Sequence, residues 1–140
     1  MLKLIQTDWG VFDLAPNDPA LDDFVADITS LIYASLFTDA EAPDSLVSDP
    51  YDRRGWWADS GAGSGLWYVR RQGLSTAARN ECITIIKRTL AAHDEALQNI
   101  QVETLPLNTS AIPIAGNSSS VTLLITGLHN GQKFIVRASL

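Results

Sequence analysis

Asn130-Gly131 is the feature of this sequence that most restricts its fold. Two apolar runs, residues 121–128 and 132–140, flank this dipeptide. Both turn residues tolerate positive φ, and two such residues between apolar runs are typical of the tight loop of a β-hairpin. Because the loop length sets the pairing of the strands, the dipeptide predicts both an antiparallel hairpin and its register.

That register divides the predicted hairpin into two faces. The first face is mainly apolar and is expected to cover the helices; it pairs His129 with Gln132, Gly127 with Phe134, Ile125 with Val136, Leu123 with Ala138 and Val121 with Leu140. The second face is mixed and contacts either water or a partner; it carries Leu128, Thr126, Leu124 and Thr122 against Lys133, Ile135, Arg137 and Ser139. Five of its residues are candidate interface positions: Leu124, Thr126, Lys133, Ile135 and Arg137.

Two helices are predicted before the hairpin. Asp18 can cap the free backbone amides of a helix whose first position is Pro19, and apolar residues recur with helical spacing as far as Phe37. A second helix begins at Ser75 or Thr76 and continues to about Asn99. Its apolar stripe is wide, which indicates that it is buried more deeply than the first.

Four further apolar segments predict strands: residues 2–5, 11–14, 66–69 and 100–107. The first two suit a terminal hairpin or a pair of edge strands, and the last changes phase at Leu105, which indicates a bend or a bulge. All these elements predict one α+β domain over residues 1–140, with two main helices packed on a small, mostly antiparallel sheet. The composition agrees, since 46% of the 140 residues are hydrophobic and 19% are charged.

The charge distribution argues against nucleic-acid binding. Residues 1–49 hold ten acidic residues against Lys3 alone, whereas residues 50–140 hold nine basic residues against six acidic ones. So few basic residues, without a recognised binding motif, make nucleic acid an unexpected partner.

We expect a protein of the reducing cytoplasm and not of the membrane, because no apolar run has the length of a span, no signal peptide is apparent, and the single Cys82 suits a buried thiol.

The sequence lacks recognisable motifs for catalysis or metal binding. His93, His129 and Cys82 are too few and too scattered for a metal site, and no serine lies in a nucleophile-elbow pattern. We therefore expect no metal, no cofactor and no enzymatic activity. A glycosidase needs only two carboxylates beside a groove, and Glu81 is the candidate for such a role. A surface ion pair with Arg79 or Lys87 is the favoured interpretation of Glu81.

The long connection at residues 38–65, here called the Arg/Trp loop, holds the most distinctive segment of the chain: Asp52-Arg53-Arg54-Gly55-Trp56-Trp57. A connection of this length inside a compact domain is usually functional. Arginine and tryptophan are enriched in the energetic centres of protein interfaces, so Arg53, Arg54, Trp56 and Trp57 are candidate interface residues. Alternatively, the tryptophan rings close a small core under the loop while the arginines bind loop carbonyls and nearby aspartates. Both interpretations stay open.

Several of these residues also resemble a known family. The matching segments are Ser35-Leu36-Phe37-Thr38-Asp39-Ala40, then Asp52-Arg53-Arg54-Gly55-Trp56-Trp57 with Asp59, then Leu66-Trp67. Followed by a helix and a C-terminal hairpin, they resemble the baseplate wedge proteins of Mu-like contractile phages. That group is similar to the wider set of sheath-initiator, or lysozyme-like wedge, proteins of contractile tails. The resemblance covers most of the chain from about residue 30 onward.

The resemblance implies a structural protein of the virion that lies in the tail baseplate and is assembled in the host cytoplasm. Several copies would form a ring, with baseplate wedge proteins, tube or hub proteins and the tail sheath protein as partners. The C-terminal strands would then template the first sheath ring by strand addition. Two alternatives remain: a peptidoglycan-cleaving, lysozyme-like enzyme that uses Glu81, and a free-standing adaptor that binds through its Arg/Trp loop.

Overall fold

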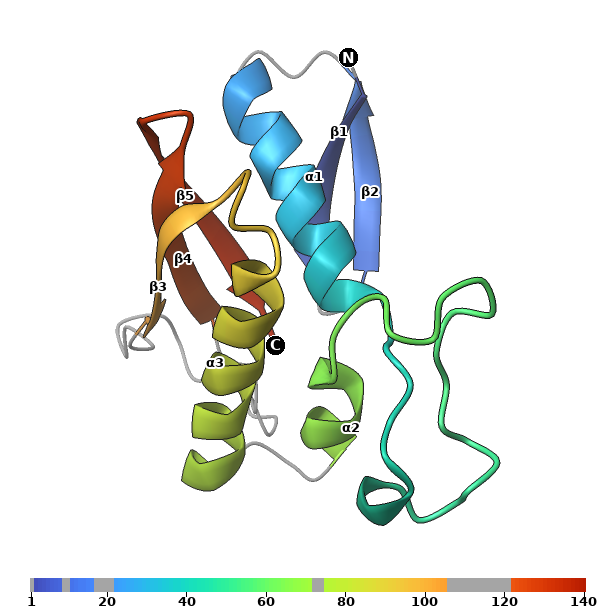
Figure 1. The fold of residues 1–140 in the computed structure, drawn as a ribbon. Helices are drawn as coiled ribbons and strands as arrows, with labels where there is room; N and C mark the ends of the chain where they lie inside the picture. The colour runs from blue at the N-terminus through green and yellow to red at the C-terminus, as the bar shows by residue number, and fades with distance from the viewer. Residues whose placement is uncertain (1, 9–10, 17–21, 72–74, 106–121) are drawn as a thin grey trace, which may run out of the picture.

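The computed structural model describes residues 2–8, 11–16, 22–71, 75–105 and 122–140. Within them the chain forms the predicted α+β fold, with helices packed against a small C-terminal antiparallel sheet (Figure 1). The elements in chain order are β1 (Leu2–Asp8), β2 (Val11–Pro16), α1 (Asp23–Phe37), η1 (Asp44–Leu46), α2 (Leu66–Arg71), α3 (Thr76–Ala91), β3 (Gln98–Thr104), β4 (Thr122–His129) and β5 (Gln132–Ser139).

The hairpin of β4 and β5 has the predicted register wherever the structure describes it. His129 pairs with Gln132 around a turn whose residues, Asn130 and Gly131, both have positive φ. Val121 lies outside the described residues, so its predicted pairing with Leu140 is not tested. The face predicted to cover the helices is buried, and its fully or almost fully buried side chains are Leu123, Ile125, Phe134, Val136 and Ala138. The hairpin therefore supplies one wall of the core, as its alternation predicts.

A third strand extends this sheet to the order β3-β4-β5. The predicted strand over residues 100–107 is present but is displaced, because β3 begins at Gln98 and ends at Thr104. Its register shifts between Gln98 and Gln101, where Asn99 has positive φ, and not at Leu105 as predicted. Asparagine tolerates this conformation better than most residues, which is a local reason for the bulge at this end of the strand.

Helix α1 ends at Phe37 as predicted and begins at Asp23, where the side chain of Asp22 accepts a hydrogen bond from the amide of Phe24. The predicted cap at Asp18 and Pro19 lies outside the described residues. The buried side of α1 carries Ala26, Ile28, Ile32, Tyr33 and Leu36, and the last four pack into the same core as the C-terminal sheet. Of the apolar positions with the predicted helical spacing, only Ile28 and Ile32 are fully buried, whereas Phe24, Val25 and Leu31 are half-buried.

Helix α3 begins at Thr76, and the hydroxyl of Ser75 accepts a hydrogen bond from the amide of Ala78, as expected of a cap. Its predicted end at Asn99 is wrong, because the helix stops at Ala91. Residue Leu97 continues the apolar spacing and is buried, but it lies after a turn in which its amide donates to the carbonyl of His93. The apolar spacing therefore continues to Leu97 although the helix has already ended.

The predicted strand at residues 66–69 is also wrong, because these residues form α2. A run of four apolar residues does not by itself distinguish a buried strand from a buried helical turn. In the structure Leu66 and Val69, three positions apart, are buried next to α3, and the indole N–H of Trp67 donates to the carbonyl of Ala40 at 2.8 Å. Helical geometry thus satisfies both the apolar side chains and the indole.

The predicted N-terminal hairpin is confirmed as β1 and β2. Phe12 of β2 packs against the rings of Tyr33 and Phe37 of α1, with ring centroids 5.2 and 5.0 Å apart. Strand β1 also contacts β5 and so brings the start of the chain to the edge of the C-terminal sheet. The two small sheets are joined through α1 and this contact.

Candidate protein-binding surfaces

Hydrogen bonds between its own two halves shape the Arg/Trp loop. Asp39 and Ser64 form an isolated parallel bridge, in which the amide of Ala40 donates to the carbonyl of Ser64 at 3.0 Å. Further along, the amide of Ala42 donates to the carbonyl of Arg53 at 2.9 Å. The outgoing and returning segments therefore lie side by side, on the opposite side of the helices from the three-stranded sheet (Figure 1).

The two arginines of the loop make intramolecular contacts. Arg53 lies 3.1 Å from Glu41 and 3.0 Å from Asp44, and its Nε donates to the carbonyl of Ala42 at 2.9 Å. The first two contacts are ion pairs of partly exposed groups, so each stabilises the fold only modestly. The geometry assigns Arg53 to holding the loop together, as the second interpretation of the sequence proposed.

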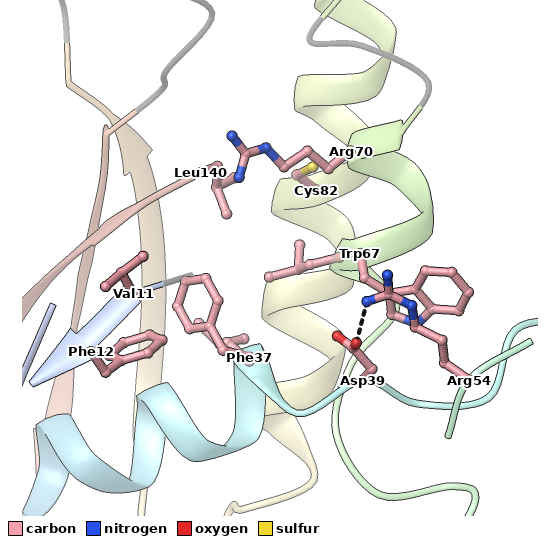
Figure 2. A pocket seen from close by; sticks show the side chains of 11 residues that line it. Val11, Phe12, Phe37, Asp39, Arg54, Trp67, Arg70, Cys82 and Leu140 are labelled. Carbon is pink, nitrogen blue, oxygen red and sulfur yellow. Dashed lines mark hydrogen bonds and ion pairs between the residues drawn. The ribbon is translucent and has the colours of Figure 1, made fainter. Parts of the chain in front are cut away.

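Arg54 joins the loop to α2. Its Nη1 lies 2.6 Å from Oδ2 of Asp39, and its guanidinium carbon lies 4.7 Å from the ring centroid of Trp67 (Figure 2). The guanidinium of Arg71 lies 4.9 Å from the same ring, and its Nη1 lies 2.9 Å from Asp52. The ring of Trp67, only 7% exposed, is therefore the buried centre on which two arginines stack.

A pocket of about 470 Å³ lies beside this stack, between β2, the end of α1, α2 and α3 (Figure 2). Phe12, Phe37 and Trp67 contribute aromatic walls, and the Arg54–Asp39 pair lies at one end. Cys82 also lines the pocket, and burial, followed by the negative charge of Glu81, raises the pKa of its thiol. The thiol is therefore held neutral, which does not favour nucleophilic chemistry.

The tryptophans of the Arg-Arg-Gly-Trp-Trp segment differ from its arginines in their exposure. Trp56 is 50% exposed and Trp57 is 93% exposed, and their rings meet edge to face with centroids 6.1 Å apart. Trp56 borders a groove of about 710 Å³ between the C-terminal ends of α1 and α3, together with Ala34, Thr38, Thr89, Ala92 and His93 among others. Exposed aromatic area beside a groove of mostly small side chains is a surface that suits a protein partner.

The second candidate surface is the outer face of the C-terminal sheet. Lys133, Ile135 and Arg137 of β5 are exposed, Ile135 by 61%, and Leu124 and Thr126 of β4 are half-buried beside them. Thr126, Lys133 and Ile135 also line a shallow hollow of about 390 Å³. The structure thus places the nine predicted interface residues in two groups on opposite sides of the helices (Figure 1).

The described residues do not form a geometry that supports a catalytic or a metal-binding site. Among the described residues, no three His, Cys, Asp or Glu side chains lie close enough to hold a metal ion, and no described helix is long and apolar enough to cross a membrane. Glu81 is exposed on α3, and the hollow that it borders contains no second carboxylate among the residues described. The glycosidase geometry considered for Glu81 requires that second carboxylate.

Comparison with known proteins places the sequence in a family. A family model described as phage protein GP46 matches residues 28–120, two thirds of the chain, including the whole Arg/Trp loop, α2, α3 and β3. The chain belongs to this family. The baseplate protein gp46 of Escherichia phage Mu is 29% identical over an alignment of 114 residues, which covers 77% of this GP46-family chain and 66% of the Mu protein. The chain therefore spans just under two thirds of the length of that relative, and the predicted resemblance to Mu-like baseplate proteins is confirmed.

No solved structure matches this GP46-family protein. The family match ends before β4 and β5, so the C-terminal hairpin has to be interpreted from its own geometry. The residues that the sequence left unnoticed are Gln6 and Tyr33, whose side chains bind the backbone of β5. Gln6 is a polar residue directly after the apolar run of β1, and this position in the sequence does not reveal a contact with Ser139.

Proposed function

We propose that this GP46-family protein is a structural, non-enzymatic subunit of the baseplate of a contractile phage tail. It binds wedge and tube or hub proteins through the Arg/Trp loop and templates the first sheath ring by adding a sheath strand to β5. Several copies form a ring in the virion, after assembly in the host cytoplasm. The family membership and the Mu relative support the baseplate role, and the open edge of β5 is the observation that carries the templating role.

The register of the hairpin determines which backbone groups of β5 point outward. Around a two-residue turn, the closing pair exchanges both of its backbone hydrogen bonds, and the pairs alternate from there. The amide and carbonyl groups of Lys133, Ile135, Arg137 and Ser139 therefore point away from β4. In agreement, the amide of Leu105 donates to the carbonyl of Thr122, the partner of Ser139, on the β3 side of β4.

The outward backbone groups of Lys133 and Ile135 have no hydrogen bond from any residue that the structure describes. Such an edge suits strand addition, in which main-chain hydrogen bonds supply affinity and alternate side chains supply register. Lys133, Ile135 and Arg137 present a cation, an aliphatic group and a second cation on one side of the strand. A partner strand with acidic residues around an apolar one would complement that pattern.

The exposed tryptophans suit the contact with the other baseplate proteins. Trp57 has almost no packing to lose inside its own chain, whereas burying its ring against a partner removes a large apolar area from water. Arg53 and Arg54 support this contact indirectly, because they hold the loop that carries Trp56 and Trp57.

A proline at position 135 tests the templating role. Proline lacks the outward N–H that an added strand needs, yet edge strands tolerate it where that N–H faces away from the sheet. The Ile135→Pro variant, introduced into the phage that encodes this protein, is expected to give baseplates without sheath in negative-stain electron micrographs. The Ile135→Thr variant keeps the N–H and a β-branched side chain and is expected to give sheathed tails.

Normal sheathed tails in the Ile135→Pro phage would contradict the templating role. Deletion of residues 132–140 is a weaker experiment, since it also removes the buried side chains of Phe134, Val136 and Ala138 and so unfolds the core. Circular dichroism of the purified Ile135→Pro protein, with a wild-type spectrum expected, shows whether the substitution acts on the edge alone.

A further inference from the structure

One end of the β5 edge is covered by a side chain from the other end of the chain. Nε2 of Gln6 donates to the carbonyl of Ser139 at 3.1 Å, and Oε1 of Gln6 accepts from the amide of Ser139 at 3.0 Å. A carboxamide offers the same donor and acceptor as a peptide group. Gln6 therefore binds Ser139 as a residue of an adjacent strand would, although β1 is not part of that sheet.

A second side chain covers the position next to it. The hydroxyl of Tyr33 in α1 donates to the carbonyl of Arg137 at 2.7 Å. Tyr33 is buried and its ring packs against Phe12 of β2, so the N-terminal hairpin also fixes this contact. Burial raises the pKa of the Tyr33 hydroxyl, which keeps the proton that the contact needs.

The edge of β5 is thus divided into two parts. The outward groups of Lys133 and Ile135 accept or donate no hydrogen bond within the described residues, whereas the outward carbonyl of Arg137 and both outward groups of Ser139 are occupied. We infer that Gln6 is an edge-blocking residue, which prevents a second copy of this chain from pairing with β5 along its whole length.

The geometry of self-pairing makes the second copy the relevant occupant. Two antiparallel β5 strands related by a two-fold axis, paired along their length, would place Lys133 opposite Ser139 and Ile135 opposite Arg137. In this register neither pair places like charges directly opposite each other, whereas a register shifted by two residues would place Lys133 opposite Arg137. Gln6 occupies both outward backbone groups of Ser139, whereas Tyr33 occupies only the carbonyl of Arg137, so Gln6 supplies the larger part of the block.

Amide hydrogen exchange in the wild-type protein tests the block without any substitution. Ile135 and Ser139 both direct their N–H groups out of the sheet, and within the part of the chain that the structure describes only that of Ser139 has an acceptor, in Gln6. The Ser139 amide is expected to exchange roughly tenfold or more slowly than the Ile135 amide in an NMR measurement. Fraying at the end of a strand would act in the opposite direction. Equal rates, or a faster Ser139, would overturn the inference.

Three variants test the consequence for self-association. Gln6→Ala removes both hydrogen bonds, so the Ser139 amide should exchange as fast as that of Ile135, and dimers should form in sedimentation experiments at a concentration roughly tenfold or more below that of the wild type. The double variant Gln6→Ala with Ile135→Pro should return to the wild-type monomer, because the new edge again lacks a donor. Gln101→Ala, at an exposed glutamine of β3, should behave as the wild type.

A Gln6→Ala protein that stays monomeric over the wild-type range would overturn the inference, as would a dimer that persists with Ile135→Pro. The measurement needs only the purified chain and does not depend on the sheath. Its failure would therefore leave the templating proposal open, and sheathed tails in the Ile135→Pro phage would leave the role of Gln6 open.

Discussion

Replacing Phe134 by alanine is expected to lower the free energy of unfolding by about 3–5 kcal/mol, the usual cost of removing a buried aromatic ring. Phe134 is only 2% exposed and is the largest fully buried side chain among the described residues. Its ring lies over Gly127 so closely that a Cβ at Gly127 would lie 2.8 Å from its Cζ. Gly127 has no side chain that could move into the space left by the ring, so the cavity would stay open, which places the cost at the upper end.

Urea denaturation followed by circular dichroism measures this loss. Ile135→Ala is the matched control, since Ile135 is the next residue of the same strand but points outward and is mostly exposed. Its loss is expected to stay below about 1 kcal/mol. Equal losses in the two variants would mean that the two faces of the hairpin are not divided as the register requires, and the description of the β5 edge would then be wrong.

Replacing Gly63 by alanine is expected to cost about 3 kcal/mol, because two penalties add. Gly63 has φ +95°, which disfavours residues with a Cβ by about 1–2 kcal/mol. The Cβ would also lie 2.1 Å from the carbonyl oxygen of Thr38, so the backbone has to move by an amount that costs about 1–3 kcal/mol. That carbonyl accepts the amide of Ser64, one of the bonds that close the Arg/Trp loop.

Gly61→Ala is the control within the same loop. Gly61 does not have a positive φ of the kind that favours glycine, and the nearest atom to a Cβ there is Oδ1 of Asp59 at 3.5 Å, an ordinary contact. Its effect on the urea midpoint is expected to be small, within about 0.5 kcal/mol. If the two alanine variants were equally stable, the loop would not be closed by the hydrogen bond between Thr38 and Ser64. The proposal that the closed loop holds Trp56 and Trp57 in place for a partner would then be wrong.

The C-terminal hairpin was predictable because its signals are local and agree with each other. The Asn130-Gly131 turn, the alternation on both sides and the loop length all specify one register. The ends of α3 and the nature of α2 were not predictable in this way. At Leu97 and at Leu66–Val69, burial comes from contacts with distant parts of the chain. An apolar residue in the sequence does not indicate whether it is buried in a helix, a strand or a turn.

The candidate surfaces show the same division. The sequence placed Arg53, Arg54, Trp56 and Trp57 in one distinctive segment, but only coordinates separate the arginines, which bind Asp39, Glu41 and Asp44, from the exposed tryptophans. The contact of Gln6 with Ser139 spans almost the whole chain and has no local signal. Side-chain contacts at that separation depend on the packing of α1 between the two small sheets.

The position of β5 in the assembled tail tests the account most directly. A cryo-EM map of the baseplate at side-chain resolution can show this GP46-family protein together with its neighbours. The account predicts a strand of the first sheath ring paired with β5 through the outward groups of Lys133 and Ile135, and Trp57 buried against a wedge, tube or hub protein. A map that lacks this chain, or in which the β5 edge faces solvent beside an ordered sheath, would contradict it.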